Sequence, residues 1–437
     1  MLKAFGSAMR TPDLRNKILF TLLIIALYRV GAHVPSPGVL VGNIQQCIKQ
    51  ANAGGQADIY SLVNLFSGGA LLQLSIFALG IMPYITASII IQLLTVVIPR
   101  FELLKKEGQS GQSKLTQYTR YLTIALAVLQ ATGIVALARS GQLFQCDREI
   151  LANKDSIFQY AILVITMTAG TAVVMWFGEL LTEKGVGNGM SLLMATSIAA
   201  RIPAEGASIA SRGQAILIAM IALSLVVIVT VVFVEQAQRR IPVQYAKRMI
   251  GRKMYGGTST YLPLKVNQAG VIPVIFASSL LYIPQLIVQL QGNSEAGAVR
   301  RFFENYVINQ SSWVHIALYF LLIIFFAYFY VAITFNPEER ADEMKRYGGF
   351  IPSIRPGRPT AEYLQYVLNR ITLPGSIYLG VVAILPNLLL SLTGPAGSSQ
   401  NLPFGGTAVL ILVGVSLETV KQIESQLQQR NYEGFLR

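Results

Sequence analysis

Few side chains in this 437-residue sequence are placed to do covalent chemistry. The only histidines, His33 and His315, lie on separate apolar stretches without a second metal ligand at helical spacing. No GxxxxGK[ST] phosphate-binding loop occurs, so nucleotide hydrolysis by that route is not expected. The two cysteines, Cys47 and Cys146, fit neither a metal pattern nor a disulfide framework, and whether they pair is left open. The sequence therefore predicts no enzyme, no catalytic residue, no metal and no cofactor.

Charged side chains are also scarce inside the apolar stretches. Glu179, Glu235 and Glu418 lie at the ends of such stretches, where capping or solvation is the expected role. Arg29 is the deepest charge, and two interpretations stay open: its stem snorkels to the interface, or its charge is buried against a partner. Ion-coupled transporters usually bury ionisable groups as substrate or proton sites. Their absence here favours a gated passage over a coupled pump.

The composition predicts a multi-span helical membrane protein. Hydrophobic residues make up 53% and charged residues 13% of the chain, whereas a soluble domain carries about 25% charged residues. The uncharged stretch from Ile371 to Leu417 is too long for one helix, and the turn-forming segment Thr393 to Gly406 splits it. Taking roughly 17 to 25 apolar residues per span, we expect ten spans, at about 18–34, 72–98, 118–138, 156–178, 186–201, 214–235, 267–290, 312–334, 373–392 and 404–422.

The distribution of Lys and Arg orients these spans. Of the 35 basic residues, 26 lie in the N-terminal segment, alternate loops after it and the C-terminal tail, against 8 in the other loops. By the positive-inside rule both termini are predicted to be cytoplasmic. The first residues lack the pattern of a removable signal peptide, so none is expected.

A nine-residue pattern occurs in both halves of the chain. GIMPYITAS, Gly80 to Ser88, and GVIPVIFAS, Gly270 to Ser278, share residue types at five of nine offsets. Each proline removes a backbone donor, so each pattern predicts a helix interrupted in mid-span. The patterns fall in the second and seventh spans, which predicts two inverted five-span halves, 1–202 and 203–437, around a central pathway. The alternative is a chance match, since Pro and Gly are ordinary in membrane helices.

A short apolar segment precedes the second span. Asp58 can cap a helix from Ile59 to Phe66, and Ser67-Gly68-Gly69 ends it. Eight residues cannot cross a bilayer, so the segment is either an interfacial helix or a re-entrant piece in a protein-lined cavity.

Two loops on the predicted cytoplasmic side, 236–266 and 335–372, are larger than turns require. The first contains EQAQRRIPVQYAKRMIGRK, and the second contains IPSIRPGRPT, in which prolines flank Arg355. Orientation of the spans needs only a few basic residues near span ends. The excess predicts docking of an acidic partner.

Five segments resemble the signature sequences of the SecY family, the central subunits of bacterial protein translocases, and the resemblance covers essentially the whole chain in order. They are FSGGALLQLSIFALGIMPYITASIIIQLL, TEKGVGNGMSLL, RRIPVQYAKR, VNQAGVIPVIFASSLLYIP and GFIPSIRPGRPT.

The resemblance implies an all-α fold of ten transmembrane helices whose halves face each other around an hourglass pore. It assigns a pore ring to Ile81, Ile85, Met194, Ile275 and Ile411; Met194 departs from the branched aliphatic residue expected there. It assigns a plug to the segment 57–69, with Ile59, Leu62, Val63, Asn64, Leu65, Phe66, Ser67 and Gly68. It assigns amides and a hydroxyl to a lateral gate, at Thr86, Gln92, Gln130, Asn267 and Gln268. Docking of a motor or ribosome is assigned to Arg239, Arg240, Lys247, Arg248, Arg355 and Arg358.

The implied function is translocation of unfolded secretory polypeptides across the bacterial cytoplasmic membrane, with lateral release of membrane segments into the lipid. The pore is passive and is driven from outside. The implied partners are SecE and SecG, the SecA motor ATPase, the ribosome, signal-sequence-bearing polypeptides and membrane lipids, with no specific nucleic acid beyond ribosomal RNA. Two alternatives are a secondary transporter of small solutes built on an inverted repeat, and a membrane scaffold without a pathway.

Overall fold

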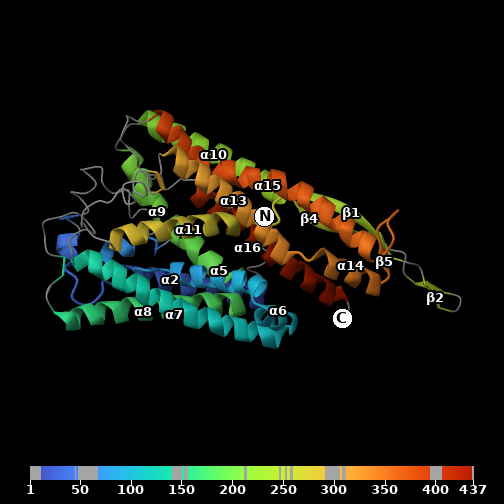
Figure 1. Cartoon of the computed structure of the whole chain (residues 1–437), viewed down its shortest axis with the longest axis horizontal. Coiled ribbons are helices and arrows are strands. Elements are labelled where there is room, and N and C mark those ends of the chain that lie inside the picture. The colour runs from blue at the N-terminus through green and yellow to red at the C-terminus, as the bar shows by residue number, and fades with distance from the viewer. Residues whose placement is uncertain are drawn as a thin grey trace.

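The computed structural model describes residues 11–44, 46–47, 67–139, 150–151, 156–210, 214–245, 248–250, 253–255, 259–290, 306–307, 312–393 and 406–435. Helices dominate these residues (Figure 1). The helices are α2 (Pro12–His33), the 3₁₀ turn η1 (Leu71–Gln73), α5 (Met82–Val97), α6 (Pro99–Lys106), α7 (Gln109–Arg139), α8 (Ile157–Lys184), α9 (Gly189–Ala210), α10 (Gln214–Gln236), α11 (Ile272–Leu290), α13 (Trp313–Thr334), α14 (Pro337–Arg346), α15 (Arg358–Thr393) and α16 (Gly406–Phe435). The strands are β1 (Gln238–Tyr245), β2 (Arg248–Ile250), β3 (Lys253–Tyr255), β4 (Ser259–Lys265) and β5 (Gly349–Phe350).

A helix lies in each of the ten predicted spans, namely α2, α5, α7, α8, α9, α10, α11, α13, α15 and α16. By length and composition, five helical stretches of the described residues could cross a membrane: Gln109–Arg139, Ile157–Lys184, Trp313–Arg346, Arg358–Leu385 and Gly406–Gln428. A sixth is added if α5 and α6 count as one bent span. The predicted boundary between the halves, 202/203, falls inside α9, which continues to Ala210.

The predicted interruption of the second and seventh spans is wrong in form, because a helix begins at each motif. The helix α5 starts at Met82 and α11 at Ile272, so Pro83 and Pro273 lie in first turns, where a missing N–H costs no hydrogen bond. Gly80 (φ +56°) and Gly270 (φ +61°) both take the left-handed conformation two residues before the helix. The repeated sequence pattern therefore corresponds to a repeated local backbone conformation.

The helix α5 ends in a sharp bend. A 100° change of direction separates it from α6 at Ile98, whose extended conformation (φ −102°, ψ 114°) is the one favoured before a proline. The short helix α6 then packs against the start of α7. Because of this bend, α6 runs across one end of the bundle and not along its long axis.

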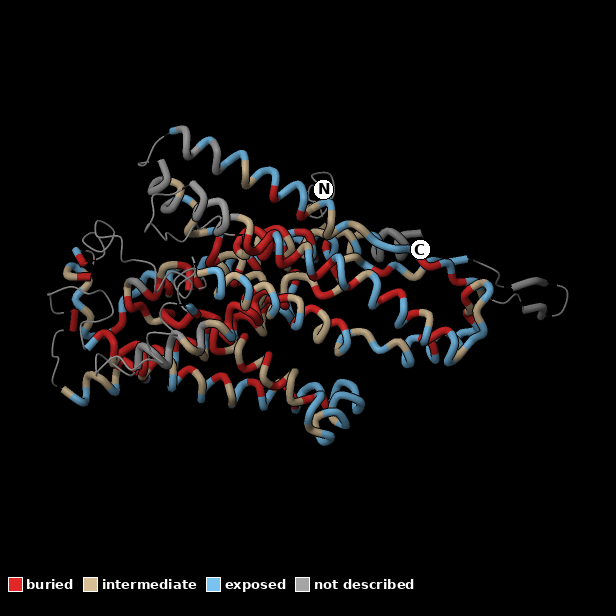
Figure 2. Tube along the Cα trace, turned by 45° about the horizontal axis from the view of Figure 1, so that its top comes forward, coloured by how far each residue is buried: buried red, intermediate tan, exposed pale blue. Residues whose placement is uncertain are grey.

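The two halves of the bundle contact each other along two lines. On one line α9 contacts α10 and α16, and on the other α11 contacts α5 and α7. In Figure 1, α7 and α8 lie along one long edge and α10 and α15 along the other, with α11 between them. Buried residues concentrate in the middle of the bundle (Figure 2). Large apolar side chains remain exposed on its outside, among them Val97, Phe158 and Phe233 at 75%, 75% and 77%, as expected of a surface that faces lipid.

The two large loops form ordered structure together. Antiparallel β1 pairs with β4 over its length and, at Gln244 and Tyr245, with β5 from the second loop, which gives the sheet order β4-β1-β5. The strands β2 and β3 form a separate hairpin at the tip. We call this end of the molecule, with α6 and α14, the sheet end; it is on the right in Figure 1. The sequence-based prediction treated both segments only as loops.

The opposite end is tied by short backbone contacts. Bridges join Pro35 to Ser75 and Val39 to Leu151. Cys47, buried near them, is disulfide-bonded, and Cys146 is the only other cysteine in the sequence. The statement that the cysteines fit no disulfide is therefore wrong for Cys47.

Candidate functional site

The five residues assigned to the pore ring lie in one buried apolar cluster. They come from the starts of α5 and α11 and from α9 and α16, and none is more than 8% exposed; they are Ile81, Ile85, Met194, Ile275 and Ile411. Ile85 and Ile275 occupy the same offset of the repeated motif. Their amides bond to the carbonyls of Ile81 and Val271, at 3.1 and 3.3 Å. Two equivalent helix starts therefore place equivalent isoleucines in one apolar cluster.

The polar residues assigned to the lateral gate do not bond to one another among the hydrogen bonds of the described residues. The hydroxyl of Thr86 donates to the carbonyl of Met82 in its own helix, at 3.0 Å. The amide of Asn267 donates to Glu235 of α10 and to the carbonyl of Gly270, at 2.5 and 3.1 Å. Gln92 and Gln130 are half-buried, and the buried Oε1 of Gln268 has no hydrogen-bond partner within the described part of the chain. Among the hydrogen bonds of the described residues, none of these side chains links α11 to α5 or α7.

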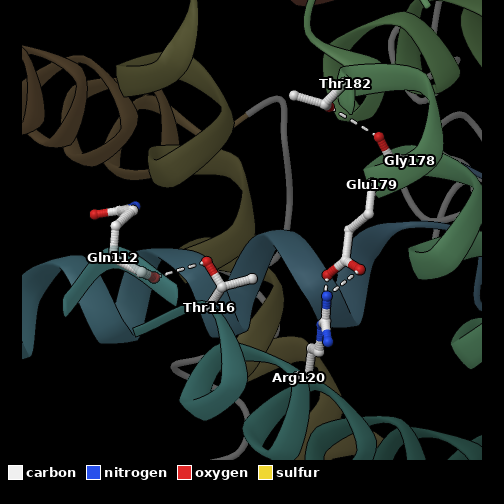
Figure 3. Close-up of polar contacts among 6 residues, drawn as sticks. All are labelled: Gln112, Thr116, Arg120, Gly178, Glu179 and Thr182. Atoms are coloured by element: carbon white, nitrogen blue, oxygen red, sulfur yellow. Dashed lines mark hydrogen bonds and ion pairs between the residues drawn. The ribbon is translucent and has the colours of Figure 1, made fainter. Parts of the chain in front are cut away.

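Two of the three glutamates have specific partners that the sequence did not predict. Glu179 of α8 accepts two hydrogen bonds from Arg120 of α7, from Nε at 2.8 Å and from Nη2 at 2.7 Å (Figure 3). Glu235 accepts the hydrogen bond from Asn267. The expectation of simple capping or solvation is therefore wrong for both, whereas Glu418 is exposed as expected. The partners of Glu179 and Glu235 lie 59 and 32 residues away in the sequence, so no local sequence pattern indicates these hydrogen bonds.

Arg29 of α2 points to the described end of the plug segment. Its Nη1 donates to the carbonyl oxygen of Gly68 at 3.2 Å. This contact favours the second interpretation of Arg29, a partly buried pairing, although the partner is a backbone dipole and not a charge. Ser67, which is buried, accepts a hydrogen bond from the amide of Leu71. The other named plug residues, Ile59 to Phe66, lie outside the described residues.

The basic residues assigned to docking gather at the sheet end. Arg239 and Arg240 are exposed on β1, and Arg355 is exposed in the turn after β5. Ile351 is buried and Ile354 half-buried in an apolar cluster beneath this turn, and the carbonyl of Arg355 accepts a hydrogen bond from Thr360, at 2.9 Å. Arg358 forms an exposed ion pair with Glu362. The side chain of Arg248, at the start of β2, and all of Lys247 lie outside what is described.

The sheet end also carries a contact between the halves that the sequence did not indicate. The ammonium of Lys105 in α6 donates to the carbonyl of Ile333 in the last turn of α13, at 3.1 Å. Across the described residues no group of three or more His, Cys, Asp or Glu could hold a metal ion. The site is therefore a buried apolar junction of four segments, with basic residues at one end.

Known proteins resemble this chain along its length. The family model SecY matches residues 75–420. Over the full length of both chains, the protein translocase subunit SecY of Mycobacterium bovis is 69% identical, that of Mycobacterium leprae 67% and that of Streptomyces scabiei 64%. A solved protein-conducting channel gives a TM-score of 0.63 at 18% identity, covering 94% of this chain and 91% of that one. A second structure, from work on the plug domain of SecY, gives 0.62 at 18% identity over the same shares. With a family match over most of its length and relatives this similar, the chain belongs to the SecY family.

Proposed function

We propose that this chain is the protein-conducting subunit of a bacterial protein translocase. The observation that carries the proposal is the apolar junction where the starts of α5 and α11 meet α9 and α16, in a chain of the SecY family. The relatives are named protein translocase subunits. The substrate is an unfolded secretory polypeptide, and membrane segments leave sideways between α11 and the pair α5 and α7.

The ring gates by being apolar and adaptable. Water in a narrow apolar constriction is unfavourable, so a closed ring resists ion flow without a charged barrier. Isoleucine side chains and the thioether of Met194 can pack around a moving chain of varied shape. The segment 57–69, of which the structure describes Ser67 to Gly69, is the proposed plug.

The proposed orientation puts the sheet end in the cytoplasm, with both termini on the same side. The basic loops then serve as the docking surface for the SecA motor or the ribosome. SecE and SecG are the proposed membrane partners. The proposed source of energy for transport is the motor or the ribosome; the sequence contains no GxxxxGK[ST] phosphate-binding loop of its own.

The alternative, a secondary transporter of small solutes, gains no support from the family or from the site. Such a transporter needs ionisable or polar groups that bind substrate at the junction, and the five ring residues are all apolar. The two glutamates with partners are bonded elsewhere, Glu179 to Arg120 of α7 and Glu235 to Asn267 before α11.

A polar substitution in the ring tests the proposal. Ile81→Asn and Ile275→Asn should wet the constriction and raise the resting ion conductance of the purified channel in planar bilayers. Both should also relax the demand on the signal sequence. Leu417→Asn is the control, because this buried residue lies in the same apolar cluster but outside the ring. Conductance and export of a defective-signal precursor at the parent level in both ring variants would refute the ring.

A further inference from the structure

Arg29 is a charged residue in an apolar helix, and its hydrogen bond leads to the end of the proposed plug. A charge in such a helix is normally retained for a function, and its partner shows which function. The partner here is the carbonyl of Gly68, so the guanidinium of α2 binds the backbone where the segment 57–69 leads into the turns before α5.

Gly68 is enclosed by two helices at this point. It has the left-handed conformation, with φ +66°. A Cβ added to it would lie 3.1 Å from Nη1 of Arg29 and 3.2 Å from the Cα of Ser197 in α9. Only glycine therefore fits both the backbone angle and the space between α2 and α9. The backbone of Gly68 is therefore restrained both by close packing between α2 and α9 and by the hydrogen bond from Arg29.

The same two helices are joined by the residue next to Arg29. Tyr28 and Ser197 are both fully buried, and their hydroxyl oxygens are 2.7 Å apart. Because the hydroxyl of Ser197 donates to the carbonyl of Leu193, Tyr28 must donate to Ser197. Ser197 lies one helical turn after the ring residue Met194. Consecutive residues of α2 thus hold α9 near the ring and the end of the plug segment.

We propose that Arg29 is the clamp residue that holds the end of the plug segment in the closed channel. The clamp rests on the proposed function, in which 57–69 is the plug. A hydrogen bond from a cation to a carbonyl is stronger than a neutral one, and burial strengthens it further. Opening of the plug must break this hydrogen bond and withdraw Gly68 from between α2 and α9.

The test measures the exposure of Ser67, which is fully buried in this structure. Ser67→Cys is made in every variant, and labelling by a membrane-impermeant maleimide is followed from the outer face of proteoliposomes. Cys47 does not react, because it is disulfide-bonded. With Arg29→Met we expect labelling of the resting channel to be about tenfold faster, equivalent to about 1.4 kcal/mol of lost closure. Arg29→Lys, which keeps a cationic donor, should label close to the parent rate.

Arg15→Met is the matched control, because it makes the same change on the same helix at an exposed residue of the opposite end. It should leave the labelling rate unchanged. Arg29→Gln is the second variant, used if Arg29→Met does not fold, and it should give an intermediate rate. Labelling at the parent rate in a folded Arg29→Met or Arg29→Gln channel would overturn the clamp.

A further measurement distinguishes failure of the clamp proposal from failure of the plug assignment. The parent channel with Ser67→Cys is labelled while a signal-bearing precursor and motor are engaged. Faster labelling on engagement supports the plug, so a missing effect of the Arg29 variants then counts against the clamp alone. No acceleration on engagement would count against the plug assignment, and the clamp would fall with it.

Discussion

The ammonium of Lys105 in α6 lies 3.1 Å from the carbonyl oxygen of Ile333 in α13, and this hydrogen bond joins the two halves of the bundle at the sheet end. A cation at the C-terminus of a helix is favourable, because the last carbonyls have no partner within the helix and carry negative potential. Next to it, the Glu102 carboxylate holds the pKa of Lys106 above its ordinary value, and Glu339 of α14 adds to the shift. The bent segment after α5 is thus held against the second half by its basic residues.

Loss of the Lys105 contact should make the gate easier to open. In Lys105→Met the carbonyl of Ile333 loses its donor and the halves lose a link beside α5 and α11. Charge interactions at helix ends stabilise by about 0.3–1 kcal/mol, so we expect export of a precursor with a weakened signal sequence to rise roughly two- to fivefold. The measurement is translocation into inverted membrane vesicles.

The control for this prediction is Lys114→Met. Lys114 lies 3.9 Å from Glu107, so its ion pair stays within the first half. Its loss should not change the demand on the signal sequence. Equal export in the two variants would show that the Lys105 contact does not restrain the gate.

The hydrogen bond between Asn267 and Glu235 should stabilise the start of α11. Asn267 is 3% exposed, and its replacement by Leu leaves a partly buried carboxylate without this donor. We expect Asn267→Leu to destabilise the protein by about 1–3 kcal/mol, seen as a lower midpoint of thermal unfolding in detergent.

A double-mutant cycle isolates this contribution. Replacing both partners by apolar groups removes the unpaired carboxylate, so Asn267→Leu with Glu235→Leu should recover part of the loss. Strictly additive effects of the two substitutions would mean that the hydrogen bond contributes nothing to stability.

Arg355 and Arg358 should differ sharply in docking, although both are exposed arginines of one turn. The side chain of Arg355 is exposed on a turn that is anchored by Ile351 and Thr360. The guanidinium of Arg358 is already paired with the carboxylate of Glu362. We expect Arg355→Glu to reduce motor-driven translocation to background while membrane insertion and folding stay intact. Arg358→Glu should cost far less.

A side-by-side translocation assay with purified motor checks the pair. Insertion is checked separately, by protease protection of the sheet end. Equal, small losses in both variants would mean that the two arginines serve only the orientation of the spans.

Much of the fold was predictable because each span carries its own signal. Runs of apolar residues gave a helix in all ten predicted places, and the repeat pointed to the two helix starts. The backbone form of the motifs was not predictable, since a proline in an apolar run fits a kinked helix as well as a first turn. The left-handed conformations of Gly80 and Gly270 decide between these forms.

The contacts between distant segments were the part that sequence could not supply. Pairing of β1 with β5 joins residues more than 100 positions apart, and β5 has only two residues. The hydrogen bonds of Arg29, Lys105 and Asn267 likewise depend on which helices pack together. The apolar ring was assigned through the family resemblance, because isoleucine and methionine in a membrane helix carry no distinguishing pattern of their own.

Pro83 and Pro273 have a consequence for how a polypeptide would move through the proposed ring. An extended chain offers unpaired N–H and C=O groups along its whole length, and exposed donors at a constriction would bind them and slow the chain. Neither proline has an N–H to offer, and the amides of Ile85, Val274 and Ile275 are already bonded to carbonyls of the preceding turn. Each proline therefore removes one of the donors that a helix start leaves unpaired, which lowers the number of backbone groups that could bind a moving chain whatever its sequence.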